Sequence, residues 1–141
     1  MMRLLFDTNV ILDAFFERDY DYKPSQQLMR YAAAGDIKAY LSAKQITDIY
    51  YSLRKYYSEE SKRRDVIKII LKIFEILPTT KSDINYCLNS EMADLEDALL
   101  DEVCSVNCIN GLVTNNIKDF NKAKSVIFSP NDVLSLIGAS K

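Results

Sequence analysis

The stretch LLFDTNVILDAF (residues 4–15) decides the fold. Its first three residues are an apolar run typical of a buried strand, and Asp7 ends that run. From Asn9 the apolar residues recur at helical spacing, so we expect a helix over 9–17. A carboxylate directly after a buried strand is costly to desolvate unless it is paired. Two interpretations of Asp7 follow: it caps the next helix, or it binds a metal ion at the strand end with support from Asn9.

Outward from this stretch, the chain repeats the order of strand and helix. Further strands are predicted over 38–41, 75–77, 111–114 and 125–128. Helices are predicted over 24–34, 42–56, 60–74, 83–90, 94–106 and 130–137. Strands that alternate with helices form parallel sheets covered on both faces. We therefore predict an α/β fold, a three-layer α/β/α domain with a central parallel sheet of four or five strands, and a single domain over 1–141.

Composition excludes several classes of protein. The chain has 141 residues, 48% of them hydrophobic, and no histidine, so it has no Ser-His-Asp triad and no histidine-bound zinc. The most apolar stretch, 67–77, contains three charged residues, which argues against a membrane span. Cys87, Cys104 and Cys108 are odd in number and lack a CxxC pair, which indicates reduced thiols in a cytoplasmic protein. Acid–base or metal chemistry would therefore depend on carboxylates.

Charge is unevenly distributed although the net charge is only -2. Residues 54–72 contain seven basic and three acidic side chains, whereas residues 83–102 contain seven acids and no base. An acidic block repels itself unless it is solvated or neutralised by cations. The pattern indicates either solvated helix faces or an acidic cation site near a basic surface for a polyanion.

The predicted topology selects the acids that can share a site. Sites in open parallel sheets form beyond the carboxyl ends of the strands, where Asp7 and Asp119 are expected. Asp94, Asp97 and Asp101 recur on one face of the 94–106 helix. Helix capping and a polar outer face are the alternative explanation for these three acids. Carboxylates around one cavity suit Mg²⁺ or Mn²⁺, because these ions prefer oxygen ligands.

Three motifs together resemble the PIN-domain ribonucleases, most closely the VapC-like toxins of bacterial toxin–antitoxin pairs. They are LLFDTNVILDAF, DLEDALL (residues 94–100) and GLVTNNIKDF (residues 111–120), in the order and spacing of that family. The resemblance covers about residues 3–135. It implies a metal-dependent endoribonuclease that cleaves RNA phosphodiester bonds by a metal-activated water, with Mg²⁺ or Mn²⁺ as cofactor. It also implies an antitoxin partner and a homodimer.

The resemblance also implies roles for particular residues. The catalytic and metal-binding acids would be Asp7, Asp48, Asp97 and Asp119. The supporting residues would be Asn9, Thr114, Asn116, Asp94 and Asp101. Asp48 departs from the pattern, because the family usually has Glu there and Asp is one methylene shorter. Lys44 stands four residues earlier, so a surface ion pair is the alternative explanation for Asp48.

RNA contacts are expected from the basic stretch, with Arg54, Lys55, Lys62, Arg63 and Arg64 as candidates. A solvated helix pair or a partner-binding surface is the alternative. Two other functions compete with the nuclease. One is a non-catalytic PIN-like module that binds RNA or protein. The other is a phosphoacceptor signalling domain, which the sequence disfavours because no middle strand ends in Asp.

Overall fold

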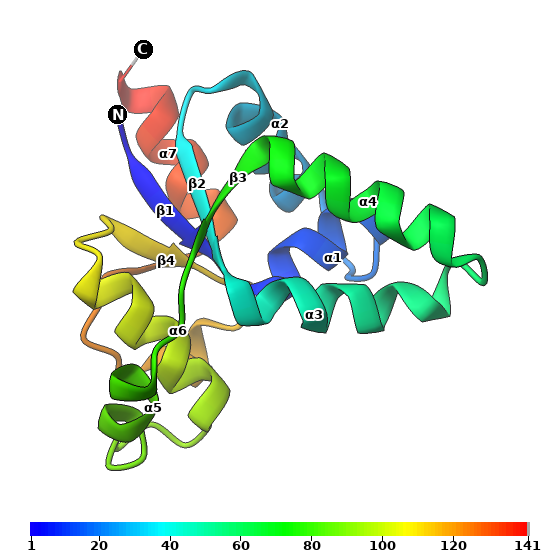
Figure 1. Cartoon of the computed structure of the whole chain (residues 1–141). Helices are drawn as coiled ribbons and strands as arrows, with labels where there is room; N and C mark the ends of the chain where they lie inside the picture. The colour runs from blue at the N-terminus through cyan, green and yellow to red at the C-terminus, as the bar shows by residue number, and fades with distance from the viewer. Residues whose placement is uncertain (141) are drawn as a thin grey trace.

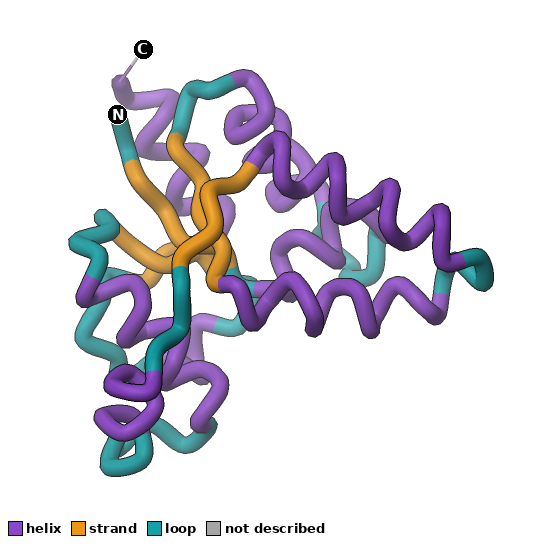
Figure 2. The backbone as a smooth tube through the Cα atoms, in the orientation of Figure 1, coloured by secondary structure: helices purple, strands orange, loops and turns teal. Residues whose placement is uncertain are grey.

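The computed structural model describes the backbone of residues 1–140 and the side chains of residues 1–138. Five strands form one sheet in the order β3-β2-β1-β4-β5, and every pair of neighbours is parallel. The strands are β1 (Arg3–Phe6), β2 (Lys38–Ser42), β3 (Phe74–Leu77), β4 (Gly111–Val113) and β5 (Ile127–Phe128). The predicted α/β class with a central parallel sheet is confirmed, as Figures 1 and 2 show.

Helices cover both faces of this sheet. They are α1 (Thr8–Phe16), α2 (Lys23–Ala34), α3 (Ala43–Ser52), α4 (Glu60–Ile73), α5 (Lys81–Cys87), α6 (Leu95–Val106) and α7 (Pro130–Ser140). Two short 3₁₀ turns, η1 (Leu53–Lys55) and η2 (Ile117–Phe120), complete the chain. Helices α1 to α4 and α7 contribute to the hydrophobic cluster on one face, and α6 packs on the other with α5 beside it (Figure 1).

Strand β1 shows why two layers form. Its side chains alternate between the two faces, because successive residues of a strand point to opposite sides. Leu4 and Phe6 pack into the cluster with α1, α2 and α4, while Leu5 packs with Leu100 and Val103 of α6. The three β1 side chains are completely buried, as expected for the central strand of a parallel sheet covered on both faces.

Several predicted boundaries were wrong by a few residues. Helix α4 ends at Ile73, because Phe74 turns extended, pairs with Ala39 and packs edge-on against the ring of Phe6 at 5.2 Å. Helix α5 begins at Lys81, where Thr80 rather than a later residue supplies the N-cap. The predicted 42–56 helix ends at Ser52 and continues as η1, and the predicted 125–128 strand shortens to β5.

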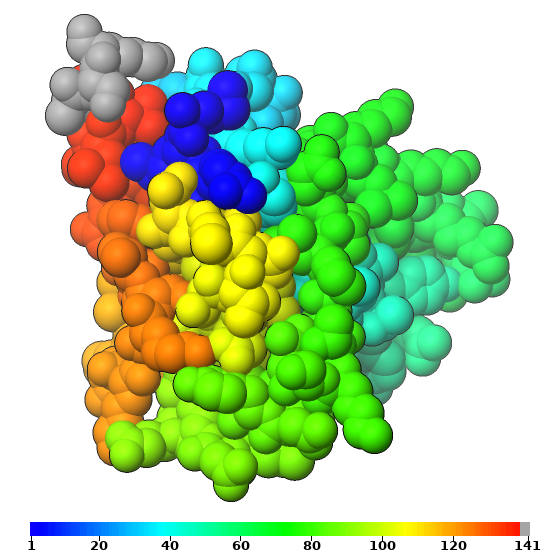
Figure 3. Space-filling view, turned by 60° about the vertical axis from the view of Figure 1, so that its left-hand side comes forward, coloured from blue at the N-terminus to red at the C-terminus, as the bar shows by residue number. Residues whose placement is uncertain are grey.

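Helices α3 and α4 form a long hairpin, residues 43–73, that extends beyond the edge of the sheet. Figures 1 and 3 both show this hairpin projecting to the right of the strands. Helix α3 begins where β2 ends, so its first turn lies at the carboxyl edge of the sheet. Ten residues of helix then carry the chain about 15 Å away from that edge. No described helix is long and apolar enough to cross a membrane.

Candidate functional site

Asp7 occupies the carboxyl end of the central strand. Its backbone amide continues the sheet by donating to the carbonyl of Val113 at 2.8 Å. Its carboxylate oxygen Oδ2 accepts the Thr114 hydroxyl at 2.8 Å and the Asn9 side-chain amide at 3.2 Å. Asp7 holds the N-cap position of α1 without a side-chain capping hydrogen bond. The carboxylate is therefore oriented by Thr114 across the sheet edge and by Asn9 of α1, and the backbone amides of Thr8 and Asn9 at the start of that helix also act on its pKa.

The surroundings of Asp7 disfavour a bare negative charge. Burial raises the pKa of the Asp7 carboxyl above its ordinary range, and the Thr114 hydrogen bond lowers that pKa only in part. The charge of Asp119 raises the pKa further. Thr114 itself is completely buried, and its hydroxyl oxygen also accepts the Asn116 backbone amide at 3.0 Å. Asn9 and Thr114 thus both support Asp7, whereas Asn116 contributes through its backbone.

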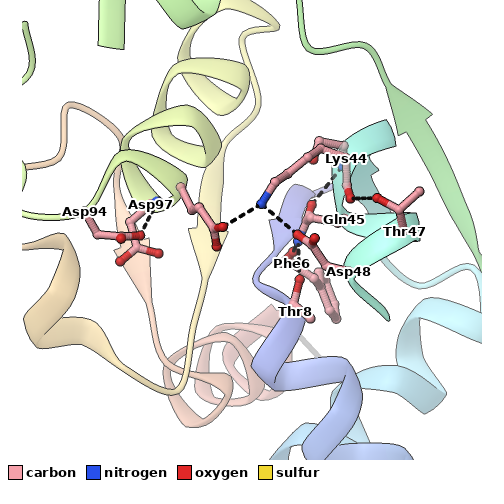
Figure 4. Close-up of polar contacts among 10 residues, drawn as sticks. Phe6, Thr8, Lys44, Gln45, Thr47, Asp48, Asp94 and Asp97 are labelled. Atoms are coloured by element: carbon pink, nitrogen blue, oxygen red, sulfur yellow. Dashed lines mark hydrogen bonds and ion pairs between the residues drawn. The ribbon is translucent and has the colours of Figure 1, made fainter. Parts of the chain in front are cut away.

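Asp97 faces the same region from the first turn of α6. Its backbone amide donates to Asp94 Oδ2 at 3.1 Å, so Asp94 acts as the N-cap of this helix (Figure 4). Burial raises the pKa of Asp97 to about 7, and the charges of Asp7, Asp94 and Asp119 add to the increase. A helix N-terminus normally favours a carboxylate, so burial together with the repulsion from neighbouring acids outweighs the helix dipole here.

A pocket of about 160 Å³ brings Asp7 and Asp97 together from segments ninety residues apart. Helix α3 contributes Lys44 and Asp48 to its wall, and α6 contributes Glu96. Asp119 lies in η2 and lines a neighbouring, larger groove of about 710 Å³ together with Asn116. The two hollows are electrostatically connected, because the charge of Asp119 acts on both Asp7 and Asp97.

Asp48 is held by Lys44. The Lys44 ammonium lies 2.8 Å from Asp48 Oδ2 and 3.1 Å from Glu96 Oε1, so it bridges α3 and α6 (Figure 4). Burial lowers the pKa of Lys44, but the hydrogen bonds to the two carboxylates outweigh that effect and leave the pKa raised. The ion-pair alternative for Asp48 is the arrangement present in this structure, although Asp48 still lines the pocket.

Asp101 lies outside the pocket despite its place on the same helix as Asp97. It is 3% exposed, and its carboxylate accepts the backbone amides of Lys124 and Ser125, both at 2.9 Å. These bonds fasten α6 to the segment that follows Asp119. Asp101 therefore holds the two acid-bearing segments together and contributes no ligand to the pocket.

Sequence reasoning missed two buried polar networks beside the site. Gln45 donates to the carbonyl oxygen of Phe6 at 2.7 Å and accepts the Ser42 backbone amide at 2.8 Å, which ties the start of α3 to β1. The spacing of Ser42 and Gln45 matches a capping box and could have indicated this. Asn115 donates its side-chain amide to Asp13 at 2.7 Å, and no sequence signal pointed to that contact.

The basic residues of the 54–72 stretch do not approach the pocket as a group. Arg63 donates to the carbonyl oxygens of Tyr57 and Ser58, and Arg64 pairs with Glu60. Arg54 lies over the ring of Tyr51 at 5.2 Å. Lys55 and Lys62 are exposed near the tip of the α3–α4 hairpin. Three of the five candidate residues, Arg54, Arg63 and Arg64, thus make local contacts within the hairpin.

The donor set of the site suits a divalent cation, although no cage is preformed. No three Asp, Glu or Cys side chains among residues 1–138 lie close enough as they stand to hold a metal ion. Asp7 and Asp97 nevertheless line the same pocket, and burial raises the pKa of both carboxyls, so a nearby cation would favour their charged forms. The available ligands are carboxylates, hydroxyls and amides, which fit Mg²⁺ or Mn²⁺ better than zinc.

Fold and site together define a class of protein: a parallel α/β domain with an all-oxygen acidic site at the carboxyl edge of its central strands. The sequence model of the PIN domain family matches residues 3–118. The chain therefore belongs to the PIN domain family.

Known proteins support this assignment. The chain is 32% identical over 102 residues to Ribonuclease VapC1 of Aquifex aeolicus, covering 69% of each chain. The fold is similar to VapBC2 from Rickettsia felis, solved bound to a DNA fragment from their promoter (TM-score 0.67, 18% identity, 92% of this chain and 98% of that one). It is also similar to a toxin-antitoxin complex from Klebsiella pneumoniae (TM-score 0.64, 22% identity, 90% and 97%).

Proposed function

We propose that this chain is an endoribonuclease that depends on Mg²⁺ or Mn²⁺ and serves as the toxin of a toxin–antitoxin pair. One observation carries the proposal: Asp7 and Asp97 line one pocket, where burial and the charges of neighbouring acids raise the pKa of both carboxyls. Membership of the PIN domain family and the likeness to a VapC ribonuclease support the same activity.

Each residue has a distinct part in this proposal. Asp7, Asp97 and Asp119 would hold the ion, which when bound supplies positive charge at the phosphodiester and activates the attacking water. Thr114 and Asn9 both donate to Asp7 Oδ2, which orients the carboxylate and leaves Oδ1 without a partner among the side chains of residues 1–138. Asp48 would act through its ion pair with Lys44 and not as a direct ligand.

Cleavage of a mixed set of structured and unstructured RNAs, with Mg²⁺, Mn²⁺ or EDTA, tests the proposal. Activity should require metal and should be lost in Asp7→Asn and Asp97→Asn. Asp65→Asn is a matched control, because Asp65 lies on the exposed face of α4. Mn²⁺ binding measured by electron paramagnetic resonance should fall in the first two variants alone. Cleavage that persists in them would mean that the observed activity comes from a contaminating nuclease and not from Asp7 and Asp97.

An antitoxin would dock on a surface that shares no lining residue with the acidic pocket. A shallow apolar groove of about 290 Å³ lies between α1, α2 and α4 and is lined by Phe15, Met29, Ile69 and Ile73, among others. One solved structure of similar fold is a toxin-antitoxin complex from Klebsiella pneumoniae, which supports a protein partner for such a surface. Ile69→Glu should abolish the complex with the cognate antitoxin, while Leu71→Glu, exposed outside the groove, should not.

Further properties are part of the same proposal. We expect residues 1–141 to fold as a single domain, because one continuous sheet joins both hydrophobic clusters; a single cooperative unfolding transition would agree. We expect a homodimer, which sedimentation equilibrium tests. A cytoplasmic location is supported by three cysteines that form no disulfide.

A binding module without catalysis is the second candidate function. Two observations favour it: Asp48 is engaged by Lys44, and no three acids form a cage among the side chains described. Metal-independent RNA binding, without cleavage under any metal in folded protein free of antitoxin, would select this function over the nuclease.

A further inference from the structure

Lys44 is the one cation on the wall of the acidic pocket, within the part of the chain whose side chains are described. Its ammonium contacts Asp48 on its own helix and Glu96 on α6. Figure 4 shows the side chain reaching from α3 toward α6, above Asp48 and on the side of the pocket opposite Asp94 and Asp97. The bridge thus places a positive charge at the mouth of the pocket.

Helix energetics do not account for a lysine at this position. Lys44 stands in the first turn of α3, where the helix dipole disfavours a cation. The order Lys then Asp four residues later is also the weaker orientation for a helical ion pair. Exposed pairs of this kind contribute roughly 0–1 kcal/mol. The stability of α3 therefore does not explain why a lysine stands at position 44. Its position on the wall of the pocket points to a role in the site.

The ammonium can still bind a ligand. It carries three N–H donors, and Asp48 and Glu96 use two of them. No third partner is present among the residues with described side chains, and the Lys44 side chain is 37% exposed. An incoming anion could accept the third hydrogen bond while both ion pairs persist.

An RNA phosphate that enters this pocket requires a positively charged partner. Every other ionisable side chain on the wall of the pocket is acidic: Asp7, Asp48, Glu96 and Asp97. A phosphate that approaches these carboxylates is repelled until positive charge compensates them. We propose that Lys44 is a substrate-binding residue that donates a hydrogen bond to a non-bridging phosphate oxygen of the RNA at the mouth of the pocket. This inference rests on the proposed nuclease function.

The same charge acts in the opposite direction on a metal ion. A fixed ammonium in the same pocket as Asp7 and Asp97 repels a divalent cation and occupies Asp48 and Glu96. Removing the charge of Lys44 should therefore weaken RNA binding and strengthen metal binding. Removing a surface lysine that has no role at the site would change neither RNA binding nor metal binding. The two opposite effects together are therefore specific to the proposed role.

The test compares wild type with Lys44→Gln, Lys44→Arg and the control Lys68→Gln, an exposed lysine of α4 paired with Asp65. Fluorescence anisotropy measures the affinity for a labelled single-stranded RNA in Ca²⁺ at several salt concentrations. Electron paramagnetic resonance measures Mn²⁺ affinity without RNA. Circular dichroism confirms folding, which a change at this partly exposed position should preserve.

Lys44→Gln should weaken RNA binding about 3- to 10-fold and reduce the salt slope by about 0.7, the loss of one phosphate contact to a single strand. It should tighten Mn²⁺ binding about 2- to 5-fold. Lys44→Arg and Lys68→Gln should stay near wild type. If wild type binds both RNA and Mn²⁺, and Lys44→Gln binds both with the same affinities, the inference about Lys44 is wrong while the proposed function stands. If wild type binds neither RNA nor Mn²⁺, the proposed function fails and the inference with it.

Discussion

Neutralising Asp97 should make the metal-free protein more stable while removing its capacity to bind metal. Asp97 is a carboxyl whose pKa is raised from 3.8 to about 7 by burial and by the charges of Asp7, Asp94 and Asp119. The folded state therefore holds the proton more tightly than the unfolded chain does. Linkage then requires stability to fall as the pH rises from about 4 to about 7, and to stay lower above that range.

The size of this effect follows from the same numbers. At face value, the change from 3.8 to about 7 corresponds to roughly 4 kcal/mol, since one pKa unit is about 1.4 kcal/mol. Asp97 is partly exposed, so water screens much of this repulsion. The Asn variant also loses about 0.3–1 kcal/mol of favourable interaction with the N-terminus of α6. We expect Asp97→Asn to be about 1–2 kcal/mol more stable than wild type at pH 8 in EDTA.

Urea denaturation followed by circular dichroism measures this difference. The advantage of Asp97→Asn should shrink toward zero as the pH falls to 4, where Asp97 is protonated in the folded protein. Saturating Mn²⁺ should reverse the order of stability, because wild type gains about 2.7 kcal/mol at one hundred times its dissociation constant and the variant does not. Asp65→Asn should show neither effect. A destabilised Asp97→Asn at pH 8 in EDTA, or equal Mn²⁺ stabilisation of both proteins, would refute the reasoning.

Three further substitutions test the supports of the site. Thr114→Val removes the hydroxyl that donates to Asp7 at 2.8 Å. The free energy of unfolding, measured by urea denaturation, should fall by about 1–3 kcal/mol, and Mn²⁺ binding should weaken. An unchanged Mn²⁺ affinity would contradict this role of Thr114. Asp101→Ala leaves two partly buried backbone amides without their carboxylate acceptor and should cost about 1–3 kcal/mol. A change under about 0.5 kcal/mol would show that water replaces the carboxylate. Gly111→Ala drives a methyl group into the ring of Phe128, and a drop in stability of about 1–3 kcal/mol is expected, whereas an unchanged urea midpoint would mean that the ring moves aside freely.

The order of elements was predictable because it depends on local patterns. All three side chains of the run before Asp7, residues 4–6, are apolar. Such a run, bounded by polar residues, indicates a strand that is buried on both faces. The helices followed from apolar spacing and from caps such as Asp94. Boundaries were less predictable where tertiary contacts compete with helical spacing. Phe74 fits the pattern of α4 but adopts an extended backbone, where its ring packs against Phe6.

The site was predictable in part. The topological rule for parallel sheets placed Asp7 and the segment after β4 at one edge, and the structure joins them through the hydrogen bond from Thr114. Helical spacing also placed Asp97 and Asp101 on one face of α6. Their surroundings nevertheless differ, because Asp97 faces the pocket while Asp101 meets the amides of Lys124 and Ser125 one turn later. Spacing along one helix does not reveal which segment covers each turn.

By itself, the sequence determined the α/β class, the parallel sheet and the presence of acids at the strand ends, because hydrophobic periodicity and strand-end position are local properties. Only the tertiary structure decided which charges meet. The charge of Asp7 raises the pKa of Asp97, which lies ninety residues away in the sequence. Lys44 of α3 joins Asp48 on its own helix to Glu96 on α6. Electrostatic interactions depend on distance in space and on burial, and neither is encoded by the spacing of residues along the chain.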